Sequence, residues 1–216
     1  MPRLPSAGAG ISGGAAAGAS LAANAPIAND EPAPYVDDAA YEQLWALWRE
    51  ARKHTAQGEA QCTDGVARLL FEEARLLDER LYDAWLATFL PRCLYWLPRR
   101  FEPADPRTET GIYLDDRRRL GERIAMIRSG HLHAQTPPSR TRRMLSNIEQ
   151  WAGPGDTVRA RANMVIWEYR KGHMRAHAGS QIYGLAPNAH GQLAVQMKIV
   201  HLLDCDAPQG NYAFIL

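Results

Sequence analysis

The order of the hydrophobic patterns along this chain is the feature that most constrains its fold. Apolar residues recur at helical spacing in the part before Gly130, and they alternate with polar residues in the part after Thr157. Hydrophobic residues three or four positions apart mark one face of a helix, whereas alternation marks a strand with one buried face. Helices followed by consecutive strands therefore predict an α+β domain with an antiparallel sheet, and not parallel βαβ units.

Four helices are expected before Gly130, which follows the last of them where a left-handed residue commonly ends a helix. Their apolar faces contain Tyr41, Leu44, Trp45, Leu47 and Trp48; Val66, Leu69, Leu70, Ala74 and Leu77; Trp85, Leu86 and Phe89; and Leu120, Ile124 and Ile127. Aspartates are favoured as N-caps because the carboxylate accepts hydrogen bonds from the first backbone N–H groups. The expected caps are Asp37 or Asp38 for the first helix, Asp83 for the third, and Asp115 or Asp116 for the fourth. Pro91 is expected to stop the third helix.

The strands are expected mainly in the second half of the chain. Gly-Pro-Gly-Asp at residues 153–156, Lys-Gly at 171–172, and residues 187–191 are turn signals between alternating segments. The predicted strands are residues 94–97, 140–151, 157–170, 174–185, a segment around 193–199, and a short last strand at 211–216. A curved sheet that wraps over helices would bury one apolar face of each.

The first 34 residues differ in composition from the rest of the chain. They are mostly Ala, Gly, Ser and Pro, with almost no large apolar side chains, so their burial cannot offset the entropy of ordering. We predict a disordered tail at residues 1–34 and a single α+β domain at residues 35–216. A signal peptide is the alternative because Arg3 precedes a stretch of small residues, but the Leu-rich core of such peptides is missing.

Charge and cysteine content narrow the class of protein. The formal net charge is +1, which does not predict binding to nucleic acid or to a membrane surface. The longest apolar runs fall far below the roughly 18 residues that suggest a membrane span. Cys62, Cys93 and Cys205 are an odd, sparse set, which fits reduced thiols in the cytoplasm better than a disulfide framework.

The sequence lacks the ligand pattern of an iron–sulfur or catalytic metal centre. A Rieske cluster needs Cys-x-His-type ligand pairs, and no cysteine here has a histidine two residues away. The close histidine pairs are His131 with His133, in a predicted loop, and His173 with His177, on a predicted strand or turn. A pair four residues apart on a strand is too widely spaced for easy chelation, so no metal is expected at either.

Other catalytic groups have competing structural roles. Cys93 lies beside Arg92, but a buried structural thiol is the favoured interpretation over a reactive one. A set formed by Asp78, Tyr82, Asp83 and Tyr95 could in principle supply acid–base chemistry inside a cone-shaped fold. Structural roles are favoured for the acids, since Asp83 is a predicted cap and the Asp78–Glu79 helix end lies near Arg75 and Arg80.

Arginines at 140–143 and the apolar chain end are the strongest candidates for contacts with another subunit. On a strand, Arg140 and Arg142 point to one face and Arg143 to the other, so at least one arginine faces the core or a contact. A buried guanidinium needs a carboxylate, which Asp78, Asp115, Asp116 or a partner subunit could provide. An uncovered apolar end at Phe214, Ile215 and Leu216 would be sticky, so we expect it to be buried in the sheet or an interface.

Three segments in order carry a resemblance to a known family. These are LLFEEARLLDERLYDAWLATFLPRCLYWLP at 69–98, PPSRTRRMLSN at 137–147 and LLDCDAPQGNYAFIL at 202–216. Together they resemble the small (β) subunit of Rieske-type aromatic-ring-hydroxylating dioxygenases, most strongly over residues 66–216. Residues 1–60 have little counterpart, and Pro91-Arg92 stands where the family usually has an acidic pair.

The resemblance implies a fold, a role and partners. The fold is a cone-shaped, cystatin-like α+β fold of the ketosteroid isomerase and scytalone dehydratase type, with N-terminal helices packed on a curved antiparallel sheet. The role is that of a non-catalytic structural subunit of a dioxygenase complex in aromatic catabolism, without catalytic, cofactor-binding or metal-binding residues of its own.

The implied partner is a large (α) subunit that holds the Rieske [2Fe–2S] cluster and the non-haem iron. Three large and three small subunits would assemble, with electrons from a ferredoxin or reductase. Arg140, Arg142, Phe214, Ile215 and Leu216 are the candidate interface residues. The alternative functions are a stand-alone cone-fold enzyme of the dehydratase or isomerase kind, a small-molecule binder, or a homo-oligomeric interaction module.

Overall fold

A computed structural model describes residues 36–54, 62–130, 136–208, 212 and 214–216. All of them belong to one compact unit, Ala33–Leu216. The predicted tail at 1–34 and the pair His131 and His133 lie outside the described residues.

The described residues form four helices, α1 (Asp38–Lys53), α2 (Asp64–Asp78), α3 (Tyr82–Ala87) and α4 (Arg117–Arg128). Two predicted caps are confirmed by their hydrogen bonds. Asp37 Oδ1 accepts from the Ala40 backbone N at 3.1 Å, and Asp116 Oδ1 accepts from the Arg119 backbone N at 2.8 Å. Each cap satisfies an N–H group that has no partner inside its helix.

In the described part of the chain, six strands form one sheet in the order β2-β1-β6-β5-β4-β3. The strands are β1 (Phe89–Leu97), β2 (Tyr113–Asp116), β3 (Arg140–Ala152), β4 (Val158–Arg170), β5 (His173–Pro187) and β6 (Leu193–Leu202). Strands β3 to β6 form an antiparallel meander, and only the β1–β6 pairing is parallel. The predicted α+β order of helices and antiparallel strands is therefore confirmed.

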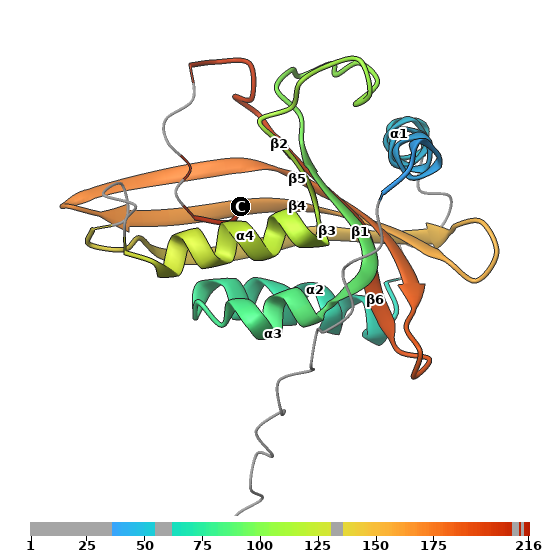
Figure 1. Ribbon diagram of the computed structural model, residues 1–216, viewed down its shortest axis with the longest axis horizontal. Helices are drawn as coiled ribbons and strands as arrows, with labels where there is room; N and C mark the ends of the chain where they lie inside the picture. The colour runs from blue at the N-terminus through green and yellow to red at the C-terminus, as the bar shows by residue number, and fades with distance from the viewer. Residues whose placement is uncertain (1–35, 55–61, 131–135, 209–211, 213) are drawn as a thin grey trace, which may run out of the picture. The chain divides into compact units, whose positions relative to one another are not determined.

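Helices cover both faces of the sheet. The larger hydrophobic cluster joins α2, α3 and α4 to one face, and it includes Leu70, Trp85 and Leu120. A second cluster joins α1 to the opposite face through Leu44, Leu47 and their neighbours on β1, β5 and β6. Figure 1 shows α2, α3 and α4 together and α1 apart from them. We refer to the face under α2–α4 as the inner face and to the α1 side as the outer face.

Several predicted boundaries are wrong around β1. Leu81, and not Asp83, is the N-cap of α3, and Phe89 belongs to β1 instead of to the helix. Pro91 lies within the strand, where the β1–β6 register shifts between Phe89 and Leu94. A proline has no N–H to donate, and such an irregular pairing is where a strand tolerates one.

Two further differences concern short strands. The β2 strand was not expected, because its residues look like the start of a helix that Asp115 or Asp116 could cap. The short last strand predicted at 211–216 is wrong for the residues that the structure describes there, since Tyr212, Phe214, Ile215 and Leu216 have no strand pairing.

Candidate functional site

The arginine that faces the inner side of β3 is Arg143, and its partner is Asp78 at the end of α2. The Arg143 side chain is 2% exposed, and its Nη1 lies 2.5 Å from Asp78 Oδ1. The Arg143 backbone N and the Thr141 hydroxyl each donate to the same carboxylate at 2.8 Å. The prediction that a buried arginine here needs a carboxylate is confirmed, and the carboxylate comes from this chain.

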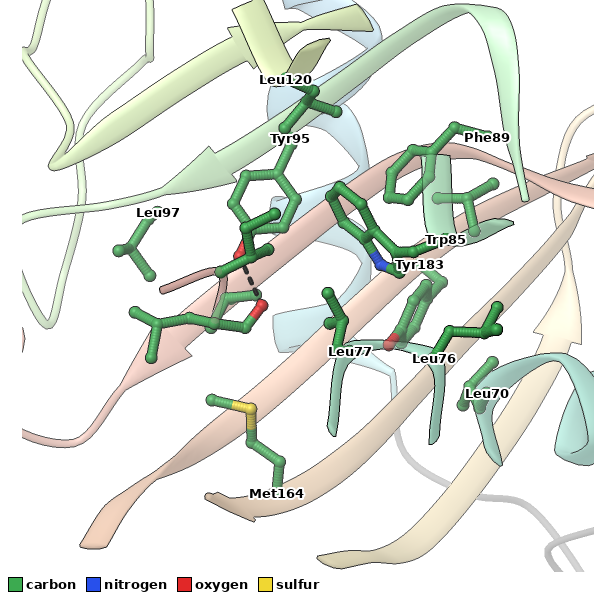
Figure 2. Packing of buried hydrophobic residues seen from close by; sticks show 14 of the residues in the cluster. Leu70, Leu76, Leu77, Trp85, Phe89, Tyr95, Leu97, Leu120, Met164 and Tyr183 are labelled. Atoms are coloured by element: carbon green, nitrogen blue, oxygen red, sulfur yellow. Dashed lines mark hydrogen bonds between the residues drawn. The ribbon is translucent and has the colours of Figure 1, made fainter. Parts of the chain in front are cut away.

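The chain end is covered by this chain itself. Phe214, Ile215 and Leu216 are all buried in the inner-face cluster. The Tyr95 hydroxyl donates to the Leu216 backbone O at 2.7 Å, which is the dashed line in Figure 2, and the Arg143 guanidinium donates to the Ile215 backbone O. Burial of the apolar end is therefore observed, and contact of these three residues with another subunit stays a prediction.

Arg140 and Arg142 lie on the outer face, on the opposite side of β3 from Arg143. The Arg140 guanidinium sits 4.6 Å from the centre of the Tyr169 ring, and Arg142 donates to the Thr141 backbone O at 2.9 Å. Arg140 pairs in register with Tyr169, and Arg142 with Trp167. Both arginines are exposed.

The four residues proposed as an acid–base set do not come together as one. Asp78 is held by Arg143, whereas Asp83 is exposed and forms an ion pair with Arg128 at 2.8 Å. Burial raises the pKa of both Tyr82 and Tyr95, and the Tyr95 hydroxyl is committed to the Leu216 backbone O. The expected pairing at the end of α2 is observed as Arg75 with Glu79, at 2.9 Å.

The most heavily buried charges belong to Glu73 and Lys198, which sequence reasoning did not single out. Glu73 Oε1 lies 2.7 Å from Lys198 Nζ and accepts from Trp85 Nε1 at 3.0 Å. Glu73 Oε2 accepts from the Tyr183 hydroxyl at 2.6 Å. Figure 2 shows Trp85 and Tyr183 close together among the leucines of α2. Both carboxylate oxygens are thus occupied by protein donors.

The pKa shifts and hydrogen bonds of this cluster are those of a structural ion-pair network that is closed to substrates. Burial raises the pKa of Tyr183 well above its ordinary value, and the nearby Glu73 charge raises it further. Burial lowers the pKa of Lys198, against the opposing effect of Glu73. A general base needs a carboxylate oxygen that can reach a substrate proton, and the contacts of Glu73 use both of its oxygens internally.

The helical spacing contained the signal for Glu73. Leu69, Leu70, Leu76 and Leu77 form the buried stripe of α2, and Glu73 lies between them on the same stripe. A charged residue in such a stripe predicts a buried partner. Lys198 lies in the same way among the buried apolar residues Val195, Val200 and Leu202 of β6.

Metal-ligating residues are dispersed in the part of the chain that the structure describes. Among those residues, no group of three or more His, Cys, Asp or Glu side chains is arranged to hold a metal ion. His177 instead approaches Glu168, at 3.1 Å, and His173 is exposed. Cys93 is buried, and burial raises the pKa of its thiol to about 12, so the prediction of a buried structural thiol is confirmed.

No helix within the described residues is long and apolar enough to cross a membrane. The helices pack on a curved six-stranded sheet, and the buried polar cluster around Glu73 lies between α2 and that sheet. This arrangement places the domain in the cone-shaped α+β class that was predicted.

Comparison with known proteins identifies the family within that class. The family model described as "Ring hydroxylating beta subunit" matches residues 72–207, and the chain belongs to this family. The predicted resemblance is thereby confirmed, and with it a role as a subunit of aromatic-ring dioxygenase systems.

Individual relatives agree with this assignment. The small oxygenase component of the p-cumate 2,3-dioxygenase system of Pseudomonas putida is 32% identical over 70% of this chain and 85% of its own length. The 2-halobenzoate 1,2-dioxygenase small subunit of Burkholderia cepacia is 32% identical over 62% of this chain and 85% of its own length.

Solved structures share the fold. The β subunit of benzoate 1,2-dioxygenase from Burkholderia mallei has a TM-score of 0.57 at 23% identity, covering 69% of this chain and 95% of that chain. A chain of naphthalene 1,2-dioxygenase has a TM-score of 0.64 at 17% identity, covering 84% of this chain and 100% of that chain. The predicted cone-shaped fold is confirmed by these likenesses.

Proposed function

We propose that this chain is the non-catalytic assembly subunit of its dioxygenase and that a large subunit carries the redox centres. The Rieske [2Fe–2S] cluster and the mononuclear iron would both belong to the large subunit. The observation that carries the proposal is the family match over residues 72–207. The cysteine spacing supports it, because no cysteine of this chain has a histidine two residues away as a Rieske ligand pair requires.

The contacts of the interior support an assembly role over the alternative of a stand-alone cone-fold enzyme. The buried carboxylates Glu73 and Asp115 are committed to Lys198 and Arg123, and the partly buried Asp78 is committed to Arg143. Removing any of these cations would leave a buried or partly buried charge unpaired, which is costly, so these carboxylates hold elements together. An enzyme of the isomerase kind would need one of them free to take a proton from a substrate.

The complex that we propose has three large and three small subunits, receives electrons from a ferredoxin or reductase, and acts on an aromatic compound in the cytoplasm. The three free cysteines of this chain are consistent with a reducing compartment. Relatives are named as subunits of benzoate, toluate and 2-halobenzoate 1,2-dioxygenases, so benzoate and 2-halobenzoate are the first substrates to test.

The test starts from the reading frames that neighbour this gene, where we expect a ring-hydroxylating large subunit, and consists of its co-expression with this chain. We expect a stable complex, with iron and acid-labile sulfide in the large subunit and none in the purified small chain. Substrate-dependent oxygen uptake should require the large subunit and a reductase. Turnover of an aromatic or keto substrate by the small chain alone would instead favour the enzyme alternative, and Asp78→Asn and Tyr82→Phe would then be the first variants to make.

A further inference from the structure

The outer face of the sheet is covered over only part of its area. Helix α1 packs against Ile182 on β5 and against Met197 and Ile199 on β6. Further along β5, toward His173, the same face is exposed. Directly paired residues of neighbouring strands point to the same face, and residues two apart on a strand do so as well. Met174 therefore lies on the same face as Ile182, beyond the part that α1 covers.

Six residues form this exposed region, which we call the outer patch. The β3–β4 and β4–β5 registers place Arg140, Tyr169 and Met174 in one row and Arg142 opposite Trp167 in the next. Met144 follows on β3. The Met144 side chain is 62% exposed, Trp167 44% and Met174 61%. Large apolar side chains gathered on one surface commonly mark an interaction site.

The composition of the outer patch is that of a protein–protein contact. Trp, Tyr, Met and Arg are the residue types enriched in interfaces, and Trp, Tyr and Arg contribute most to binding energy. A groove of about 550 Å³ at this end of the sheet is lined by every patch residue except Met144. Asp78 and Arg80 also line the groove, and the Asp78 carboxylate is already paired with Arg143.

The charge of the outer patch selects the kind of partner. Arg140 and Arg142 supply two positive charges, and no carboxylate among the described residues forms an ion pair with either guanidinium. A second copy that docked through the same patch would bring arginines against arginines, and like charges oppose such a contact. A different surface, with carboxylates beside apolar side chains, satisfies both the cations and the exposed Trp167.

We propose that the outer patch is the docking surface for the large subunit, and that its groove receives an acidic, partly apolar segment of that subunit. The inference rests on the proposed function, since it supposes that a large subunit exists. It deepens that function by assigning the contact to the uncovered part of the outer face and not to the chain end, which is already buried within this chain.

The test measures affinity of the full chain for the co-purified large subunit, with two patch variants and two matched controls. The patch variants are Arg140→Glu with Arg142→Glu, and Trp167→Ser with Met174→Ser. The controls are Arg68→Glu with Arg99→Glu, which are exposed arginines elsewhere, and Met126→Ser, which removes a methionine that is 56% exposed on α4. All replaced side chains are on the surface, so thermal melting of the small chain alone should show each variant folded.

The expected result is a loss of at least roughly 30-fold in affinity for the charge reversal and at least roughly tenfold for the apolar variant. The controls should bind within about twofold of the original chain. Added salt should weaken the original complex more than it weakens the complex of the charge-reversed variant, because salt screens the ion pairs that only the former makes.

The possible failures are distinguishable. If the unaltered chain does not bind the large subunit, the proposed function is wrong, and this inference falls with it. If the unaltered chain binds and the patch variants bind equally well, only the outer patch is excluded. If the patch variants change the self-association of the small chain alone, measured by sedimentation, a second copy occupies the patch and the inference is overturned.

Discussion

At the scale of single residues, burial decides the protonation of His201 near the end of β6. The ring is 6% exposed, packs edge-on against Trp48 at 4.8 Å, and donates from Nε2 to the Phe101 backbone O at 2.9 Å. Burial lowers the pKa of His201 below its ordinary value of 6.5, and the charge of Arg52 lowers it further. The neutral ring is therefore the form that suits the folded state.

We predict that His201 makes the domain less stable in mild acid. Between its lowered folded pKa and 6.5, the unfolded chain binds a proton at this residue that the folded chain does not. The free energy of unfolding should therefore fall as pH decreases through that window, by at most about 1.4 kcal/mol per pH unit from this group. Urea denaturation at pH 7.5 and pH 5.5 measures the effect.

The matched variant for this measurement is His201→Gln, which keeps an N–H donor for the Phe101 carbonyl but does not titrate. The free energy of unfolding of the variant should depend less on pH than that of the original chain. Parallel pH profiles for the two proteins would show that His201 does not contribute, and that other titrating groups produce any loss in acid.

The sequence alone predicts that an arginine of β3 faces inward, which is Arg143, but it does not predict which carboxylate is its partner. Alternation along β3 predicts that Arg143 opposes Arg140 and Arg142, and burial requires a carboxylate. Three aspartates of this chain and a partner subunit were equal candidates in the sequence. Only the packing of α2 on β3 selects Asp78, because that choice depends on contacts between residues far apart in the chain.

At the scale of elements, Asp78 connects the end of α2 to β3, and Arg143 connects β3 to the chain end. The Asp78 carboxylate accepts from the Thr141 hydroxyl and from the Arg143 backbone and side chain. The same guanidinium donates to the Ile215 backbone O. One buried ion pair thereby holds together a helix, an edge strand and the C-terminal segment.

We predict that Asp78→Asn destabilises the domain by about 3 kcal/mol, because it leaves the buried Arg143 charge without its counter-charge. The matched control is Asp83→Asn, which breaks the pair with Arg128 in which Asp83 is 79% exposed. An exposed pair contributes little, so the control should cost at most about 1 kcal/mol. Chemical denaturation of both variants gives the comparison, and equal losses would mean that the Asp78 pair is not structurally special.

The elements that sequence patterns predicted well are the long ones with local signals. The caps Asp37 and Asp116 and the alternation of β4 needed no knowledge of distant residues. Strands β1 and β2 were harder to predict. Strand β1 pairs with β2 and with β6, and these partners are far from it in the chain. Pro91 locally predicts a stop, yet the parallel pairing with β6 carries the strand past it.

At the scale of the whole molecule, helices α2, α3 and α4 pack on one face of the sheet, and α1 covers only part of the other face. The strands nearest α1 are buried on both sides, as in β6, where the run from Ala194 to Leu202 is almost entirely buried. Toward β3 the outer face is exposed, and neither Arg140 nor Arg142 forms an ion pair with a carboxylate among the described residues. Because the covered parts of both faces already form a buried core, we expect the domain to fold by itself. The exposed part of the outer face is then available for assembly.

If the domain folds by itself, residues 1–34, which were predicted to be a disordered tail and lie outside the described residues, should be dispensable for folding. The compact unit begins at Ala33, and Val36, the first described residue, is buried at 4% exposed. A chain that begins at Pro34 after an initiator methionine keeps Val36 and the Asp37 cap. We expect its melting temperature to stay within about 2 °C of that of the full chain, because the removed residues offer almost no apolar burial.

A slightly longer deletion is the informative control. A chain that begins at Ala39 loses Val36 and the Asp37 cap of α1. Burying a valine side chain contributes about 1.5 kcal/mol, and an aspartate cap about 1 kcal/mol. For a domain of this size, each kcal/mol corresponds to roughly 2–4 °C. The longer deletion should therefore melt about 5–10 °C lower, whereas a loss of that size already in the Pro34 chain would show that the tail packs on the domain or on a neighbouring chain.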